Sequence, residues 1–290
     1  MPKTDSATAG GPPGRRGGPD QLLTNTRSDR VKRVRGLARR SARLETGHRL
    51  VEGPQACREA AVDGYVSDLF VTPDAAAHHP EIVSATGAAG GYVHLAAEAY
   101  VAAISGDAQG VVAVARDPWA GAELAPHLAA RSGPPRLVAV FEEVRNPGNA
   151  GAVIRAADAA GAGLVVFTEA SADPTSPKVV RGSAGSYFHL PVVAGGGLEP
   201  VTAALRQAGY QVLAADGAGQ VPLFGAPDGP ADLTAPTAWV FGNEARGLTD
   251  RARAAADLTV RIPIFGRAES LNLAMAATLC LFASAQAQAG

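Results

Sequence analysis

Short apolar runs alternate with longer segments of mixed polarity along the C-terminal half of the chain. We expect strands at 136–144, 164–168, 190–193, 211–215, 238–241 and 258–264, and helices at 149–161, 176–184, 198–208, 249–256 and 271–285. Strand-length runs that are apolar throughout are typical of parallel sheets covered by helices on both faces. The pattern therefore predicts the α/β fold class, with a C-terminal domain built on a parallel sheet.

The N-terminal half predicts a tail, a basic segment and a smaller α/β domain. Residues 1–26 are rich in Gly, Pro, Ser and Thr and low in hydrophobicity, which indicates a disordered tail. Residues 27–117 combine a basic helix with a small α/β domain, whose strands are expected at 66–71, 92–95 and 110–115. Residues 118–135 contain several Pro and Gly and are expected to link this domain to a second one at 136–290.

Charge is distributed unevenly along the chain. Residues 1–49 carry 12 Lys and Arg against 4 Asp and Glu, whereas the remainder carries 14 against 23. A basic arm on an acidic body favours a polyanionic partner such as RNA. The expected RNA-binding residues are Arg33, Arg35, Arg39, Arg40 and Arg43. The alternative for this run is an ordinary solvated helix face.

Cysteine and histidine usage predicts no disulfide framework and no metal site. Cys57 and Cys280 are the only cysteines, and the six histidines show no ligand spacing. Two buried free thiols fit a reducing, cytoplasmic location. The N-terminus has no apolar signal-peptide region, and the apolar run 271–285 is shorter than the ~20 residues needed to span a bilayer, so no membrane association is expected.

The first segment with candidate chemistry lies at 142–155, where a predicted strand ends in Asn-Pro-Gly-Asn and turns into a helix. Asn149 is expected to be the helix N-cap, and Gly148 and Gly151 allow a close backbone approach. Arg155 lies one helical turn beyond Gly151 and is expected to face the same cleft as Asn146. The alternative is a plain strand, turn and helix with a surface arginine.

Two later segments have the same character. At 239–248 an apolar strand runs into Gly242 and Glu244, at the strand end where ligands of parallel sheets bind. At 261–276 Ser270 is expected to cap a long apolar helix, with Asn272 in its opening turn. Unpaired N–H groups at a helix start can hold a polar ligand. Taken singly, each segment is also compatible with an ordinary turn or an ordinary capped helix.

In order and spacing, these segments resemble the three motifs of the SPOUT superfamily, specifically its TrmH-like (SpoU) branch of RNA ribose 2′-O-methyltransferases. The matching stretches are Asn-Pro-Gly-Asn-Ala-Gly-Ala-Val-Ile-Arg at 146–155, Phe-Gly-Asn-Glu-Ala-Arg-Gly-Leu at 241–248 and Ile-Pro-Ile-Phe-Gly-Arg-Ala-Glu-Ser-Leu-Asn at 262–272. The segment 176–185 also resembles the family's stretch between motifs. The small domain before them resembles the family's RNA substrate-binding domain.

The resemblance implies a C-terminal domain with a trefoil knot, which is an exception to the rule that protein chains are unknotted. It implies S-adenosylmethionine (AdoMet) bound in the knot, an RNA substrate, with rRNA favoured over tRNA, and a homodimer with the active site near its interface. The apolar helix at 271–285 suits that interface. The cofactor-binding positions carried over are Phe241, Gly242, Ile262 and Leu271.

The resemblance also assigns catalytic roles. Arg155 would stabilise the developing alkoxide of a ribose 2′-hydroxyl and pair with a neighbouring phosphate. Asn146 and Asn272 would hold Arg155 or the ribose, and Glu244 and Ser270 would orient these groups.

The sequence departs from the family pattern at two places, and two other functions were considered. The family's Val-Ser pair after the motif Asn is Leu273-Ala274 here, and Ala156 follows the motif Arg in place of Thr or Cys. One alternative function is a knotted RNA-binding protein without catalytic activity. A nucleotide-binding dehydrogenase is disfavoured because Gly195-Gly196-Gly197 is not part of a Gly-x-Gly-x-x-Gly motif.

Overall fold

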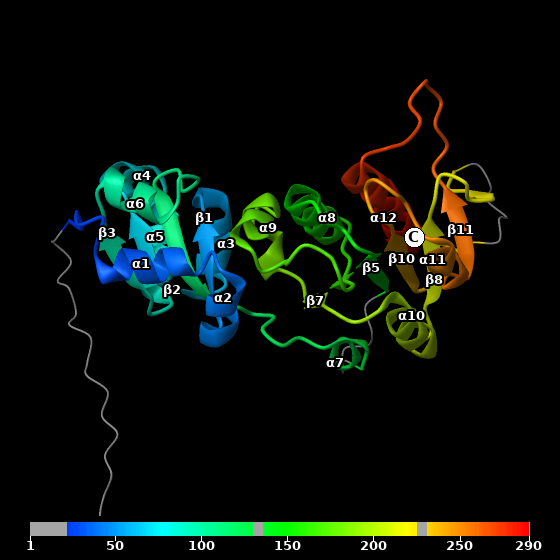
Figure 1. The fold of residues 1–290 in the computed structure, drawn as a ribbon, viewed down its shortest axis with the longest axis horizontal. Helices are drawn as coiled ribbons and strands as arrows, with labels where there is room; N and C mark the ends of the chain where they lie inside the picture. Colours follow the sequence, from blue (N-terminus) through cyan, green and yellow to red (C-terminus); the bar gives the residue numbers. More distant parts are fainter. Residues whose placement is uncertain (1–21, 130–135, 225–230, 290) are drawn as a thin grey trace, which may run out of the picture.

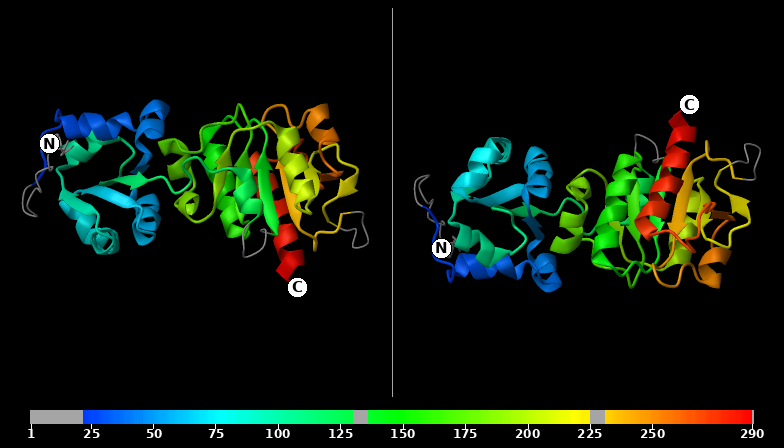
Figure 2. Two further views of the ribbon diagram at one scale, coloured as in Figure 1. Left: turned by 90° about the horizontal axis from the view of Figure 1, so that it is seen from below. Right: turned by 90° about the horizontal axis from the view of Figure 1, so that it is seen from above.

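The computed structural model describes residues 22–129, 136–224 and 231–289, and it contains two α/β domains side by side along the long axis of the molecule (Figure 1). The N-terminal domain has a four-stranded sheet, and the C-terminal domain has a seven-stranded sheet. Figure 2 shows the same two domains from below and from above, with the C-terminal helix projecting from the second domain.

The N-terminal sheet is mixed, with the order β1-β4-β2-β3. Its strands are β1 (His48–Glu52), β2 (Val66–Val71), β3 (Tyr92–Leu95) and β4 (Val111–Arg116), and only β2 and β3 pair in parallel. The helices are α1 (Asp29–Gly36), α2 (Arg40–Thr46), α3 (Pro54–Val62), α4 (Pro73–His78), α5 (Pro80–Ala88) and α6 (Glu98–Ile104). On β4, Val111 and Ala113 pack with α3 and α5, whereas Val112 packs with α1 and α6, as the two-residue period of a strand requires.

The C-terminal sheet is entirely parallel, with the order β7-β6-β5-β10-β8-β11-β9. Its strands are β5 (Leu137–Phe141), β6 (Leu164–Phe167), β7 (Val192–Ala194), β8 (Gln211–Ala215), β9 (Val221–Pro222), β10 (Thr237–Phe241) and β11 (Leu258–Arg261). The helices are α7 (Leu124–Leu128), α8 (Pro147–Ala159), α9 (Pro177–Gly182), the 3-10 turn η1 (Ser186–Phe188), α10 (Leu198–Gln207), α11 (Asp250–Ala254) and α12 (Leu273–Ala289). This sheet confirms the predicted α/β class and the predicted parallel pairing.

Helices cover both faces of the C-terminal sheet, which explains why β5 and β6 are apolar at every position. Trp239 and Phe241 of β10 pack into the cluster that contains α8 and α12, whereas Ala238 and Val240 pack into the cluster that contains α10 and α11. The Trp239 indole N–H donates to the Ser284 hydroxyl of α12 at 2.9 Å, so its one polar atom is satisfied inside the core.

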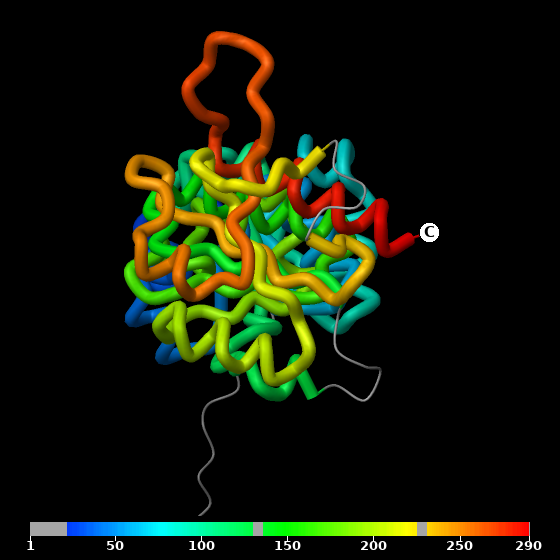
Figure 3. The backbone as a smooth tube through the Cα atoms, turned by 90° about the vertical axis from the view of Figure 1, so that its right-hand side faces the viewer, coloured from blue at the N-terminus to red at the C-terminus, as the bar shows by residue number. Residues whose placement is uncertain are grey.

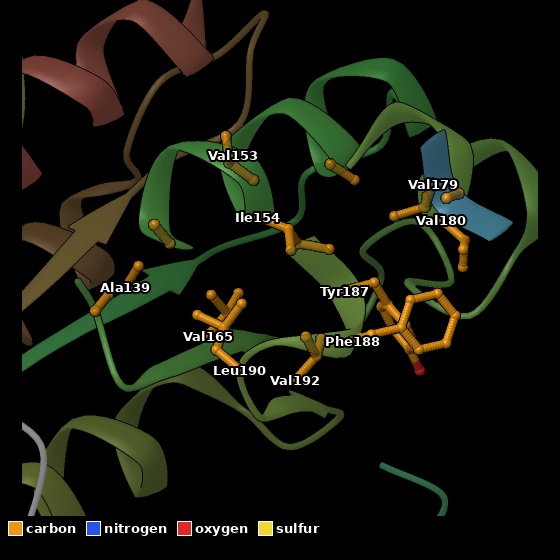
Figure 4. Packing of buried hydrophobic residues seen from close by; sticks show 14 of the residues in the cluster. Ala139, Val153, Ile154, Val165, Val179, Val180, Tyr187, Phe188, Leu190 and Val192 are labelled. Atoms are coloured by element: carbon orange, nitrogen blue, oxygen red, sulfur yellow. The ribbon is translucent and has the colours of Figure 1, made fainter. Parts of the chain in front are cut away.

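Residues of both domains form one continuous hydrophobic cluster. Cys57 of α3 belongs to the same cluster as Val179, Val180, Tyr187 and Phe188 of the C-terminal domain. Figure 4 shows Tyr187 and Phe188 beside Val192 and below Val179 and Val180. The segment that follows β4 also contacts the C-terminal domain, because the Trp119 indole N–H donates to the Tyr187 carbonyl at 2.7 Å.

Several sequence expectations need correction or fall outside the described residues. Of the predicted tail, residues 1–21 lie outside them, but Leu23 is ordered and exchanges backbone hydrogen bonds with Leu95 and Ala97 at the edge of β3. Helices α4 and α5 were not predicted, nor was the short strand β9. None of the described helices is long and apolar enough to cross a membrane.

Candidate active site

The loop after β5 leads into α8 through a capped turn. Asn146 is the N-cap, since its Oδ1 accepts from the backbone N–H groups of Gly148 at 2.8 Å and Asn149 at 3.2 Å. Pro147 occupies the first helical position, where its missing N–H costs no hydrogen bond. The prediction that Asn149 caps this helix was therefore wrong. The side chain of Asn149 is left available for other partners.

Glu244, in the loop after β10, ties this turn to the neighbouring strand. Its Oε1 accepts from the Asn146 backbone N–H at 3.1 Å and from the Asn149 side-chain amide at 3.2 Å, and its Oε2 accepts from the Arg145 N–H at 3.4 Å. Partial burial by itself would raise the pKa of the Glu244 carboxyl, but these hydrogen bonds outweigh it and hold the pKa below its usual value. Glu244 is therefore a fixed carboxylate at neutral pH.

The third segment joins the same network through Asn272. Its side-chain amide donates to Asn149 Oδ1 at 3.2 Å, while its own Oδ1 accepts from the Ala274 backbone N–H at 2.9 Å. Asn272 thus caps α12, which begins at Leu273, and the prediction that Ser270 is the cap was wrong. Hydrogen bonds connect Glu244 to Asn149 and Asn149 to Asn272, and each joins residues more than 90 positions apart in sequence.

A cavity of about 280 Å³ opens beside this network at the carboxyl ends of β8, β10 and β11. Its lining includes Ala215, Asp216, Gly217, Phe241, Gly242, Glu244, Ile262, Ile264, Glu269, Ser270 and Leu271. The loop 262–272 forms one wall and stands out from the domain (Figure 3). The chain is tightly folded here, because a Cβ added to Gly242 would lie 2.5 Å from the backbone carbon and oxygen of Gly247.

A second, wider cavity of about 660 Å³ lies on the other side of Glu244. It is lined by Arg145, Asn146, Pro147, Asn149, Asn243, Glu244, Ala245 and Arg246. On its rim, Glu143 Oε2 accepts from both Arg145 and Arg246. Burial, and then the neighbouring charge of Glu143, raise the pKa of the adjacent Glu142 carboxyl. The two cavities share Asn243, Glu244 and Ala245.

The predicted site residues fall into two groups. Phe241, Gly242, Ile262 and Leu271 line the smaller cavity together with Glu244 and Ser270, Asn146 lines the larger one, and Asn272 joins them through Asn149. Arg155 is exposed on α8 and lines neither cavity, so the expectation that it faces the same cleft as Asn146 was wrong for a single chain.

The predicted RNA-binding arginines also divide. Arg33, Arg35, Arg39 and Arg40 are exposed on α1 and α2 and at the turn between them. Arg43 is buried instead, and its guanidinium binds Asp173 Oδ2 at 2.5 Å and Thr175 Oγ1 at 3.1 Å across the domain boundary. An arginine held in this way cannot reach an RNA phosphate, so its expected role was wrong.

Sequence reasoning missed the bridging role of Asn149 and the rim formed by Glu143, Arg145 and Arg246. A usable signal was the repeated Asn in Asn-Pro-Gly-Asn, because one residue suffices to cap the helix and the other remains available. Within the described residues, no group of three or more His, Cys, Asp or Glu is placed to hold a metal ion.

The sequence profile of the SpoU rRNA Methylase family matches residues 136–282, which is the domain that carries all three loops. The chain belongs to this family. It is 39% identical over 151 residues to a 23S rRNA (uridine(2479)-2′-O)-methyltransferase of Streptomyces viridochromogenes, which covers 50% of this chain and 51% of that protein. It is 34% identical over 180 residues to the 23S rRNA (guanosine-2′-O-)-methyltransferase RlmB of Pseudomonas syringae pv. tomato, covering 62% and 70%.

A solved structure of this family supports the same fold. The SpoU methyltransferase AviRb of Streptomyces viridochromogenes, in complex with the cofactor AdoMet, is 29% identical with a TM-score of 0.73 and covers 89% of this chain and 98% of that one. The SpoU likeness in structure thus extends over both domains, whereas the sequence match to the curated Streptomyces relative spans about half of each protein.

Proposed function

We propose that the protein transfers a methyl group from AdoMet to a ribose 2′-hydroxyl of structured RNA, with rRNA favoured over tRNA. The observation that carries this proposal is the hydrogen-bonded chain Glu244–Asn149–Asn272, which joins the three family motifs beside one cavity. The SpoU relatives named above are 23S rRNA 2′-O-methyltransferases, which supports the same substrate class.

The smaller cavity fits AdoMet by its chemistry. Apolar side chains such as Phe241, Ile262 and Leu271 suit the adenine ring, and the carboxylates of Asp216, Glu244 and Glu269 suit a ligand that carries positive charge. When bound, AdoMet supplies an activated methyl group on a sulfonium. The protein then has only to hold the acceptor hydroxyl in line and to exclude competing water.

The residues on the rim would position the ribose. Asn149 and Asn272 present amide groups between the two cavities, and the carboxylate of Glu244 fixes the orientation of the Asn149 amide. Asn146 supports both, since it caps α8 and donates its backbone N–H to Glu244. Ser270 would add a hydroxyl from the facing wall. Hydrogen-bonded support of this kind keeps the site pre-organised.

Arg155 would stabilise negative charge on the ribose oxygen and pair with a neighbouring phosphate. Since Arg155 is exposed and lies outside the cavities of its own chain, it would act where RNA or a second copy of the protein brings the cavity and α8 together. The exposed arginines Arg33, Arg35, Arg39 and Arg40 would bind RNA phosphates on the N-terminal domain.

We further propose a homodimer formed through α12. Phe265 is 93% exposed, and Met275, Leu279 and Phe282 of α12 are also exposed although they are large and apolar. Such side chains next to a functional site are typical of a subunit interface. A protein that methylates rRNA would act in the cytoplasm. The trefoil knot expected from the family resemblance stays a prediction.

The test uses the full chain with radiolabelled AdoMet and protein-free rRNA, followed by mapping of 2′-O-methylated nucleotides. We expect transfer by the wild type. We expect Arg155→Ala to lose at least a hundredfold in kcat/KM while its AdoMet affinity stays within twofold. Transfer by Arg155→Ala within a few-fold of wild type would refute the role of Arg155. Binding of AdoMet and RNA without any transfer would instead indicate a non-catalytic RNA-binding protein.

A further inference from the structure

The rim of the larger cavity holds two arginines on one carboxylate. Glu143 Oε2 accepts from Arg145 Nη2 at 3.0 Å and from Arg246 Nη2 at 2.6 Å. Arg145 belongs to the loop after β5 and Arg246 to the loop after β10, so the three residues connect the same two loops that Glu244 connects. The arginine side chains remain 61% and 60% exposed, and that of Glu143 is 35% exposed. The cluster therefore faces solvent at the mouth of the site.

The backbone of Glu143 shows that this placement is enforced rather than incidental. Glu143 has a φ of 49°, a left-handed conformation that few residues other than glycine adopt. Its carbonyl accepts from the Asn243 side-chain amide at 2.7 Å, and its N–H donates to Thr168 Oγ1 at 3.3 Å. Neighbouring elements thus hold an unfavourable backbone in place, and the carboxylate is kept between the two arginines.

The cluster also has unused capacity for an anion. A guanidinium carries five N–H donors in a fixed fork, and each arginine gives only one nitrogen to Glu143. The two arginines are balanced in charge by Glu143 and Glu244, and their free N–H groups face a cavity whose remaining lining is Asn146, Pro147, Asn149, Asn243 and Ala245. Arginine forks match the oxygens of a phosphate group, and a nucleotide whose ribose lies between the cavities has a phosphate on each side.

We propose that Arg145 and Arg246 bind a backbone phosphate of the substrate RNA next to the reacting nucleotide, and that Glu143 occupies the two arginines until RNA displaces it. This inference rests on the proposed function and deepens it. An internal carboxylate of this kind lowers the affinity for any single phosphate. A long RNA that makes many contacts still displaces it, which would favour structured RNA over free nucleotides.

The experiment measures the affinity of the full chain for deproteinised rRNA over about 50 to 200 mM KCl, where each lost contact lowers the salt slope by about 0.7 to 0.9. The double variant Arg145→Gln/Arg246→Gln is expected to bind about tenfold more weakly and to lose about 1.4 or more from the slope. Glu143→Gln is expected to bind about three- to tenfold more tightly, because the arginines no longer have an internal partner.

Matched controls come from α10, on the sheet face opposite α8 and α12. Glu199→Gln, at a residue that pairs with Arg251, makes the same charge change as Glu143→Gln. Arg206→Gln, at a residue that pairs with Asp257, removes one of the two charges that the double variant removes. These controls are expected to match the wild type, and all variants are expected to keep their AdoMet affinity within twofold. Weaker or unchanged binding by Glu143→Gln, or a double variant whose slope equals that of Arg206→Gln, would overturn the inference.

The inference and the proposed function can fail separately. If the wild type binds rRNA but transfers no methyl group, the proposed function fails, and the salt slopes still decide whether the rim binds phosphate. If the wild type is active and the slopes of the rim variants equal those of the controls, only the inference about the rim fails.

Discussion

Replacing Arg43 by Met removes a buried polar contact between the two domains. The Arg43 side chain is 3% exposed, and besides Asp173 and Thr175 it donates to the carbonyl groups of Leu37 at 2.8 Å and Ala38 at 2.7 Å. Removing one partner of a buried ion pair costs about 3 to 5 kcal/mol, because the other charge stays buried and unpaired. Asp173 is 22% exposed and keeps its hydrogen bonds to Thr175, so we expect the lower end, about 3 kcal/mol.

The assay is thermal unfolding at pH 7. A loss of about 3 kcal/mol corresponds to a decrease in Tm of about 6 to 12 °C for a chain of this size. The control is Arg39→Met, which removes an exposed arginine and is expected to change stability by less than about 0.5 kcal/mol. In RNA binding Arg39→Met is expected to have the larger effect, because it should lower the salt slope of the affinity whereas Arg43→Met should not.

The pH dependence supplies an independent check. Burial works to raise the pKa of the Asp173 carboxyl, but hydrogen bonds from Thr175 and Arg43 outweigh it and hold the pKa below its usual value. A depressed pKa contributes stability above about pH 3.9, the unfolded value, and this contribution is lost as the pH falls through the folded pKa. The difference between wild type and Arg43→Met should therefore shrink below about pH 4. An Arg43→Met protein with wild-type stability at pH 7 would refute this reasoning.

Three further predictions address the cofactor loop, the domain contact and the dimer. Gly242→Ala should weaken AdoMet binding at least tenfold by calorimetry, since its Cβ would meet the Gly247 backbone, whereas Gly266→Ala, with open space around it, should not; equal affinities would contradict the proposed cavity. For His189, burial lowers the pKa, but Asp158 at 2.8 Å and Glu59 outweigh it and raise the pKa. The stability that this histidine adds is therefore complete below about pH 6.5 and is lost as the pH rises through the folded pKa. The unfolding free energies of wild type and His189→Gln, measured by denaturant titration, should therefore converge toward pH 8. A difference between the two proteins that stays the same at every pH would exclude this contribution. Phe282→Glu should turn a dimer into a monomer in analytical ultracentrifugation, and a monomeric wild type would remove the proposed interface.

Much of the fold was predictable from short stretches of sequence, because burial requires apolar residues and particular backbone conformations favour particular residues. Strands β5, β6, β8 and β10 lie within about four residues of their predicted bounds, since a strand covered on both faces is apolar at nearly every position. The turn after β5 was predictable for a similar reason, because Asn followed by Pro favours a capped helix start, although the structure places the cap at Asn146 rather than Asn149. Helices α4 and α5 were missed because their short, alanine-rich sequences carry no clear apolar stripe.

The amino-acid sequence by itself determined the parallel-sheet domain, the three loops and six of the residues that line the smaller cavity. Only the tertiary structure decided that β10 lies between β5 and β8, that Asn149 joins Glu244 to Asn272, and that Arg43 is buried against Asp173 while Arg155 is exposed. The physical reason is distance along the chain. A cap or a buried strand is specified by adjacent residues, whereas the partner of a side chain about 100 residues away depends on how complete elements pack together.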